Sequence, residues 1–218
     1  MFNEEILNYI LHDREETYLE YKDSMNWKHD GARSKIICAM LAVSNHRDGG
    51  VVVIGVKEEK FNKSFCPLGM NDDDFNSFNY DDVARIIREY SDPLIEFKLL
   101  ADTAKIDEQN RKFVVIQVAE SKEPTICIGY RLWNKTAGYF TKNIALRKNA
   151  IYIRSKAPIE SREIATIHEW RDLIDRAIEK NKKELFRKLP CLSFIKKEDI
   201  SDISDIKKHN QDLTDDNL

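Results

Sequence analysis

Apolar residues recur at helical spacing in four segments of the chain, and each segment is expected to form a helix. Asn3 can cap the first of these helices, which carries Ile6, Leu7 and Ile10 on one face. The other three are expected to run from Asp30, as the cap, to about Ser44, from Asp81 to Tyr90, and from about Ser161 to Lys188. In the last segment an apolar face is predicted by Ile164, Ile167, Trp170, Ile174 and Ile178.

Two segments near the N-terminus have strand patterns of different kinds. Residues 18–22 alternate, so that Leu19 and Tyr21 share one face while Glu20 and Lys22 share the other. Residues 51–56 are apolar at every position and rich in valine, which predicts a central strand covered on both faces.

Further strands are expected in the second half of the chain. A hairpin is predicted for 93–101 with 112–119, and two more strands for 125–128 and 151–154. We therefore expect an α+β fold with a single mixed β-sheet flanked by helices. Residues 1–190 are expected to form one domain that includes the C-terminal helix, and residues 191–218 a polar, acidic and disordered tail.

Composition narrows the class of protein. Of the 218 residues, 42% are hydrophobic and 33% are charged, which suits a packed core beneath a charged surface. The longest apolar run, residues 51–56, is far shorter than the roughly 20 residues of a bilayer span. The N-terminus is acidic, whereas a signal peptide begins with basic residues. We expect a cytoplasmic protein with no membrane association.

The net charge of −3 conceals a basic segment. No Asp or Glu occurs between Glu123 and Glu160, where the basic residues are Arg131, Lys135, Lys142, Arg147, Lys148, Arg154 and Lys156. Aromatic residues are interleaved with them. Basic side chains neutralise phosphates and aromatic rings stack on bases, so this segment predicts contact with single-stranded nucleic acid. The alternative is a hairpin whose rings belong to the core and whose basic side chains are only solvated.

Two clusters of charged residues, Glu15, Glu16, Glu20 and Lys22 in the first and Lys57 and Glu58 in the second, could supply carboxylates to a divalent ion. Glu15 precedes the strand that carries Glu20, and Glu58 follows the central strand, so strand ends could bring them together. Carboxylate oxygens suit Mg²⁺ or Mn²⁺, which could activate water against a phosphodiester while Lys22 holds the phosphate. The alternative is a surface strand with a Glu–Lys pair. His46, near Glu58 in this scheme, is a weaker candidate for substrate contact.

An ordered set of short motifs over residues 10–165 resembles the Schlafen-type, AlbA-like domain. These motifs are Glu15 to Lys22, Ala42-Val43-Ser44-Asn45, Gly49 to Val56, Leu68-Gly69, Asp92-Pro93 and Ile151-Tyr152-Ile153-Arg154. The chain departs from the family pattern in two places: His46, Arg47 and Asp48 lengthen the turn before the glycines, and Lys57 replaces the usual Asp after Gly-Val.

The resemblance implies two functions between which the residues do not decide. In animal Schlafen proteins the domain is a metal-dependent endoribonuclease that acts on structured RNA such as tRNA. That function would assign Glu15, Glu20 and Glu58 to the metal and Lys22 to the scissile phosphate, and a single lobe would form its cleft as a homodimer. Many bacterial relatives instead imply a non-catalytic DNA- or RNA-binding module, acting as a regulator or a subunit. A third option is a protein-interaction domain that uses the final helix and tail.

Overall fold

The protein is described here from a computed structural model, which covers residues 2–59, 64–129, 135–136, 139–140 and 146–188. The chain divides into two compact units, residues 1–176 and residues 177–218. The second unit is described only where it continues the last helix, as far as residue 188. The expected acidic tail, residues 191–218, lies outside the described residues.

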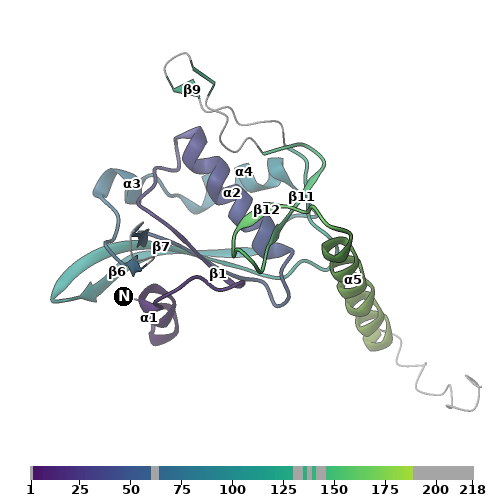
Figure 1. Cartoon of the computed structure of the whole chain (residues 1–218). Helices are drawn as coiled ribbons and strands as arrows, with labels where there is room; N and C mark the ends of the chain where they lie inside the picture. The colour runs from purple at the N-terminus through teal and green to yellow at the C-terminus, as the bar shows by residue number, and fades with distance from the viewer. Residues whose placement is uncertain (1, 60–63, 130–134, 137–138, 141–145, 189–218) are drawn as a thin grey trace, which may run out of the picture. The chain divides into compact units, whose positions relative to one another are not determined.

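The main sheet has the strand order β1-β2-β7-β6 (Figure 1). β1 (Leu19–Lys22) pairs in parallel with β2 (Gly50–Ile54), in a register that sets Leu19 opposite Val51. β2 then pairs antiparallel with β7 (Gln109–Val118), which forms a hairpin with β6 (Phe97–Ile106). The sheet is therefore mixed, and the predicted α+β class is confirmed.

A second, antiparallel sheet takes up the strands that were expected to extend the first. Its order is β12 (Ser161–Glu163), β11 (Ala150–Arg154), β8 (Ile126–Cys127) and β5 (Ser91–Asp92). Two short ladders complete the described strands: β3 (Lys57–Glu58) with β4 (Phe65–Cys66), and β9 (Lys135–Thr136) with β10 (Tyr139–Phe140).

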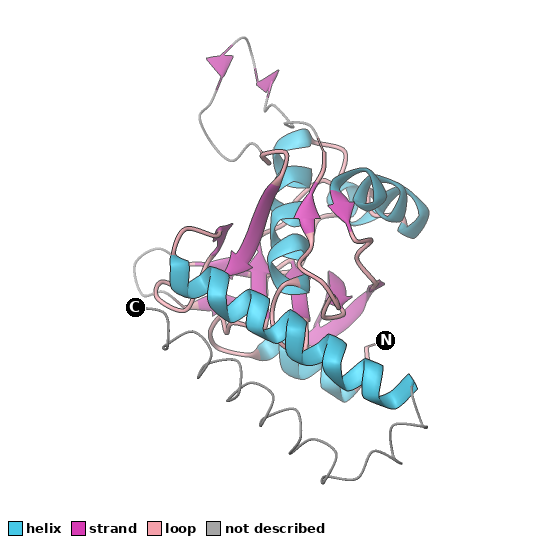
Figure 2. Cartoon of the chain, turned by 90° about the vertical axis from the view of Figure 1, so that its right-hand side faces the viewer, coloured by secondary structure: helices cyan, strands magenta, loops and turns pink. Residues whose placement is uncertain are grey.

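The central strand β2 is buried on both faces, as its sequence predicts. Val52 and Ile54 pack with helix α2 (Asp30–Ser44) in one apolar cluster. Val51 and Val53 face the other side, in a cluster with helix α1 (Glu4–Leu11). Helices α1 and α2 therefore cover opposite faces of the main sheet, and β11 and β12 lie along α2 (Figure 2).

The helix starts follow capping chemistry, with one correction. The Asn3 side chain accepts a hydrogen bond from the backbone N–H of Ile6, so the predicted cap of α1 is confirmed. The predicted cap Asp30 is wrong, because Asp30 is already the first residue of α2 and its carboxylate pairs with Arg33. The remaining described helices of this region are α3 (Asp72–Asn76) and α4 (Tyr80–Tyr90).

The last helix begins later than predicted. Residues 161–163 form strand β12, and α5 (Ile167–Lys188) starts only after Thr166. The Thr166 hydroxyl accepts a hydrogen bond from the N–H of Glu169, whose carboxylate accepts from the N–H groups of Ala165 and Thr166. This reciprocal arrangement is a capping box, and it sets the start of the helix. None of the described helices is both long and apolar enough to cross a membrane.

The turn between α2 and β2 depends on glycine. Gly49 has φ +73°, and a β-carbon added there would lie 2.2 Å from the carbonyl oxygen of Val118. A β-carbon on Gly50 would lie 2.2 Å from the carbonyl oxygen of Tyr18. The paired glycines therefore allow the chain to turn tightly between two neighbouring strands.

Candidate functional site

Arg154 on β11 joins the two acidic residues near β1 that were expected to bind a metal. Its guanidinium lies 3.0 Å from the Glu20 carboxylate and 3.4 Å from that of Glu15. It also donates to the carbonyl oxygens of Glu16 and Leu19, at 3.0 and 3.2 Å. The Arg154 side chain is fully buried, so it ties the end of β11 to β1 and does not face solvent.

Most acceptor positions of the two carboxylates are occupied by protein groups. Lys22 forms an ion pair with Glu20, and the Ser161 hydroxyl donates to the same carboxylate. Glu15 accepts the backbone N–H of Tyr21 at 2.9 Å. Burial raises the pKa of Glu15. Burial also opposes ionisation of Glu20, but the charges of Lys22 and Arg154 outweigh it and lower the pKa of that carboxyl.

The described geometry does not fit a metal held by three carboxylates. Glu15 and Glu20 are brought together, but around a guanidinium, while Glu58 lies exposed on β3. Across the part of the chain that the structure describes, no three His, Cys, Asp or Glu side chains form a group able to hold a metal ion. Lys22 forms an ion pair with Glu20, so the amine of Lys22 is directed toward the protein. Such a Glu–Lys pair was the alternative to a metal site.

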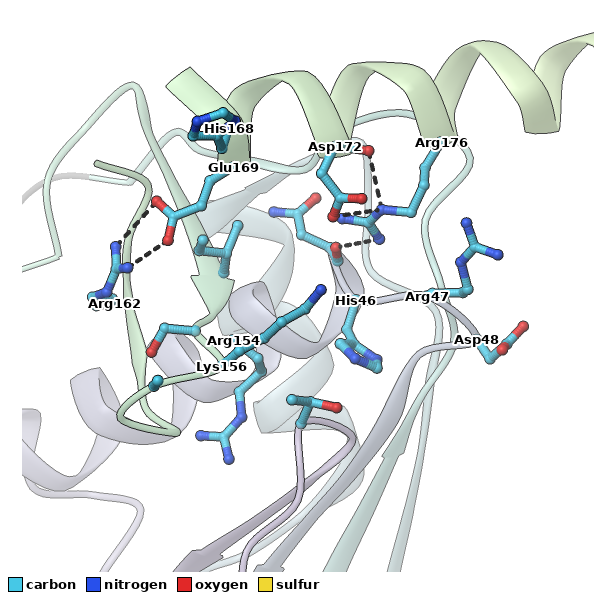
Figure 3. Close-up of a pocket in the computed structure, with 15 residues that line it drawn as sticks. His46, Arg47, Asp48, Arg154, Lys156, Arg162, His168, Glu169, Asp172 and Arg176 are labelled. Carbon is cyan, nitrogen blue, oxygen red and sulfur yellow. Dashed lines mark hydrogen bonds and ion pairs between the residues drawn. The ribbon is translucent and has the colours of Figure 1, made fainter. Parts of the chain in front are cut away.

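A cavity of about 710 Å³ opens beside this cluster (Figure 3). It lies within residues 1–176, and five stretches of chain line it: Thr17 before β1, the turn after α2, the end of β11 with the loop that follows, Arg162 on β12, and the first part of α5. Five of its lining side chains are basic and three are acidic; these are Arg47, Arg154, Lys156, Arg162 and Arg176, and Asp48, Glu169 and Asp172.

Ion pairs hold the α5 wall of the cavity in place. Arg162 contacts the Glu169 carboxylate at 2.5 Å, and this contact is the main reason that the pKa of Glu169 falls to about 2. Arg176 lies 3.4 Å from Asp172 and donates to the Asn45 carbonyl oxygen at 3.0 Å. These basic groups are largely neutralised by neighbours, so they support the wall more than they attract a ligand.

Asn45 fixes the opposite wall. Its amide nitrogen donates to the carbonyl oxygens of Thr125 and Tyr152, both at 2.9 Å, and its oxygen accepts from the N–H of Thr125 at 2.7 Å. The side chain is almost fully buried. Asn45 therefore connects the turn after α2 to both β11 and the segment before β8, and these hydrogen bonds hold this wall of the cavity together.

Two basic side chains at the cavity have no ionic or hydrogen-bonding partner among the residues that the structure describes. Lys156 and Arg47 are exposed, and neither side chain makes an ion pair or hydrogen bond with any residue that the structure describes. Lys156 extends from the β11 side of the cavity toward the turn that carries His46 (Figure 3). Arg47 lies on that turn, at the rim. These two charges are the ones available to an anionic ligand.

His46 is uncharged in this setting. Its Nδ1 lies 3.1 Å from the Gly49 carbonyl oxygen, a contact that suits the tautomer with hydrogen on Nδ1. Burial of the ring lowers the pKa of His46 below its usual value. The imidazole therefore contributes a neutral, polar surface to the cavity at neutral pH.

The seven basic residues predicted to bind nucleic acid differ in their position, burial and ion pairing. Arg131 and Lys142 lie outside the described residues, and Lys135 belongs to β9. Arg147 forms an ion pair with Glu163, and Lys148 is exposed. Arg154 is enclosed by acidic partners, so its expected contact with nucleic acid does not suit its burial. Two of the seven, Arg154 and Lys156, line the cavity. Arg154 is buried and Lys156 is exposed.

Other cavity residues were not singled out from the sequence. Arg47 is one of the three residues that lengthen the turn relative to the family pattern, and this departure was the available signal for it. Arg162, on β12, and Arg176, on α5, both have acidic neighbours in the sequence, and nothing in the local pattern distinguishes them from solvated side chains.

The chain matches a protein-family model and is similar to several solved structures. The family described as Schlafen, AlbA_2 matches residues 15–160, about two thirds of the chain. The DIP2311 protein from Corynebacterium diphtheriae is 14% identical, with a TM-score of 0.42, and the match covers 71% of this chain but 23% of that protein. The N-terminal domain of a RecG-related protein from Nitrosomonas europaea is 16% identical, with a TM-score of 0.36, covering 75% of this chain and 94% of that domain. No protein with a curated description matches the chain.

Proposed function

The chain belongs to the Schlafen, AlbA_2 family, and from this premise we propose that it binds nucleic acid through the cavity between the turn after α2, the end of β11 and α5. Family membership indicates a function related to nucleic acids. The observation that supports this cavity as the contact is the uncommitted amine of Lys156 at its wall, with Arg47 at the rim.

Charge decides which groups attract the ligand. Basic side chains already paired with carboxylates, such as Arg162 and Arg176, add little to the field outside the protein. Lys156 and Arg47 have no such neighbour among the described residues, so they supply the attraction for a phosphate. Release of condensed counterions from the nucleic acid then drives association, and affinity falls as salt rises.

The size of the cavity suits a single strand. Its volume of about 710 Å³ lies within the range of roughly 300–1,000 Å³ that is common for small-molecule sites. A site of this size accommodates a nucleotide of a single-stranded segment, with the phosphate at Lys156 and the base toward the polar walls. Of the interleaved aromatic residues that precede β11, Tyr130 and Trp133 lie outside the described residues, and Tyr139 and Phe140 form strand β10.

The test is binding of fluorescent single-stranded RNA and DNA, measured by anisotropy at several salt concentrations. Lys156→Glu and Arg47→Glu are each expected to weaken binding about tenfold. Replacement of either residue by a neutral one is expected to lower, by about one, the slope of the logarithm of the binding constant against the logarithm of the salt concentration. Lys98→Glu is the matched control, because Lys98 is exposed on the edge strand β6 and does not line the cavity. Equal losses in all three variants would place the contact elsewhere. No binding by the wild type at low salt would overturn the function itself.

The finer function implied by the resemblance is a metal-dependent endoribonuclease acting on tRNA-like RNA, with Mg²⁺ or Mn²⁺ at Glu15, Glu20 and Glu58. The placement of Arg154 between two of these carboxylates does not fit such a site, and we derive no step through a metal. Incubation of structured RNA with the protein, with Mn²⁺ or with a chelator, decides this question. Cleavage that needs the metal and is lost in Glu58→Gln would restore the enzyme hypothesis.

A further inference from the structure

Helix α5 carries an exposed apolar stripe on the side that faces away from the cavity. Ile167, Trp170 and Ile174 are 68%, 39% and 45% exposed, and their spacing of three and four residues places them along one line of the helix. This is the apolar face that the sequence predicted, but the residue of this region that packs into the core is Leu173, which is 4% exposed. Three large apolar side chains in a row on one helix face indicate a partner.

Two charged residues lie along one flank of this stripe. Arg171 and Asp175 are both exposed, and neither makes an ion pair or hydrogen bond with another residue that the structure describes. Both lie on the same side of the line through Trp170 and Ile174, because each follows one stripe residue by a single position. Their order along the helix, basic before acidic, is the less favourable one for a pair within a helix.

We propose that α5 pairs with α5 of a second copy of this chain, in antiparallel orientation, through Ile167, Trp170 and Ile174. A two-fold axis between the helices brings the same flank of each helix together. With the axis at the level of residues 172 and 173, Trp170 packs against Ile174 of the second copy, and Arg171 faces Asp175 of the second copy. The symmetry repeats both contacts, so the apolar stripe and the charged flank are each self-complementary.

The charges on the flank favour an antiparallel pairing of the two copies over a parallel one. In a parallel pair related by a two-fold axis along the helices, opposite flanks meet, and Arg171 would not face Asp175. A partner unrelated to this chain would have to supply both an apolar stripe and a matching pair of charges. The chain supplies both by itself. This gives the homodimer expected from the resemblance a specific surface.

The proposed pairing leaves the cavity open. Glu169, Asp172 and Arg176 face the cavity from the side of α5 opposite the stripe (Figure 3). Each copy therefore keeps its nucleic-acid site, and the dimer presents two of them. Two linked sites raise the apparent affinity for a strand long enough to reach both.

Sedimentation of the full chain over a range of concentrations tests the pairing, and it does not depend on nucleic-acid binding. The wild type is expected to dimerise, and Trp170→Glu and Ile174→Glu are each expected to weaken the dimer at least tenfold. Leu94→Glu is the control, since Leu94 is 52% exposed but lies outside α5. A circular dichroism spectrum checks that each variant keeps its helices. A wild type that stays monomeric up to about 0.5 mM, or a dimer unaffected by both α5 variants, would overturn the proposal.

A charge exchange tests the antiparallel register. Arg171→Glu and Asp175→Arg are each expected to weaken the dimer about tenfold, because each places like charges opposite one another. The double variant restores opposite charges across the axis and is expected to recover most of the wild-type affinity. A double variant no stronger than the single variants would rule out this register. Because Trp27 and Trp133 also emit, the emission of Trp170 is obtained as the difference between the wild type and Trp170→Phe. If this difference emission is already shifted to the blue in a monomer, the chain covers its own stripe, which would also overturn the proposal.

Discussion

The Arg154 guanidinium lies 3.0 Å from the Glu20 carboxylate, and the exposed fractions of the two side chains are 0% and 4%. The contact joins strand β11 of the second sheet to strand β1 of the main sheet. The charges of Lys22 and Arg154 favour the ionised form of the buried Glu20 carboxyl, and the Ser161 hydroxyl donates a further hydrogen bond to it. Residues that looked catalytic in the sequence therefore have a structural role in the described fold.

Replacement of Arg154 by Met is expected to destabilise the protein by about 3–5 kcal/mol, because it takes from the buried Glu20 carboxylate one of its two cationic partners. Chemical denaturation measures the loss. The double variant with Glu20→Gln and Arg154→Met removes both charges and is expected to be more stable than Arg154→Met alone. If Arg154→Met unfolds at the same denaturant concentration as the wild type, the cluster does not hold the two sheets together.

The unfolding free energy is expected to fall as the solution is acidified, in part because of Glu169. The contact with Arg162 lowers the pKa of this carboxyl in the folded protein to about 2, from an unfolded value of 4.5. A depressed folded pKa stabilises the protein above pH 4.5, and this contribution is lost as the pH falls from 4.5 toward 2. Glu169→Gln, compared with the wild type by thermal unfolding at a series of pH values, isolates the effect.

The difference between Glu169→Gln and the wild type is expected to be largest above pH 4.5 and to shrink on acidification. Glu20, whose pKa is also lowered, contributes in the same direction to both proteins and cancels in the comparison. A difference that stays constant across this pH range would show that the carboxyl of Glu169 is not held ionised by Arg162.

Millimolar Mg²⁺ or Mn²⁺ is expected to leave the melting temperature of the wild type unchanged. A ligand that binds the folded state at 100 times its Kd stabilises by about 2.7 kcal/mol, which a thermal scan detects easily. The described carboxylates do not offer such a site, because Arg154 occupies the space between Glu15 and Glu20. A rise in melting temperature that disappears in Glu15→Gln would contradict the geometry and support the metal hypothesis.

Local patterns in the sequence were enough to predict those strands and helices in which buried and exposed positions recur at a regular spacing. The double-sided apolarity of residues 51–56 predicted the central strand β2, and the alternation of residues 18–22 predicted that Leu19 and Tyr21 share one face, which packs in the cluster with α1. Asn3 could be identified as a cap because its side-chain oxygen and the N–H of Ile6 that donates to it are only three residues apart. The capping box of Thr166 and Glu169 is equally local, and it could have placed the start of α5 correctly.

Only the tertiary structure decided which charges are available and which apolar residues are covered. Periodicity places Ile167, Trp170 and Ile174 on one line of a helix, but it cannot say whether that line faces the core or solvent. The acid-free segment looked uniformly basic, yet Arg154 meets Glu20, which lies more than a hundred residues earlier in the chain. The energy of an ion pair depends on the distance in space between the two charges. The packing of the sheets therefore sets the partners of a charge, and its neighbours in the sequence do not.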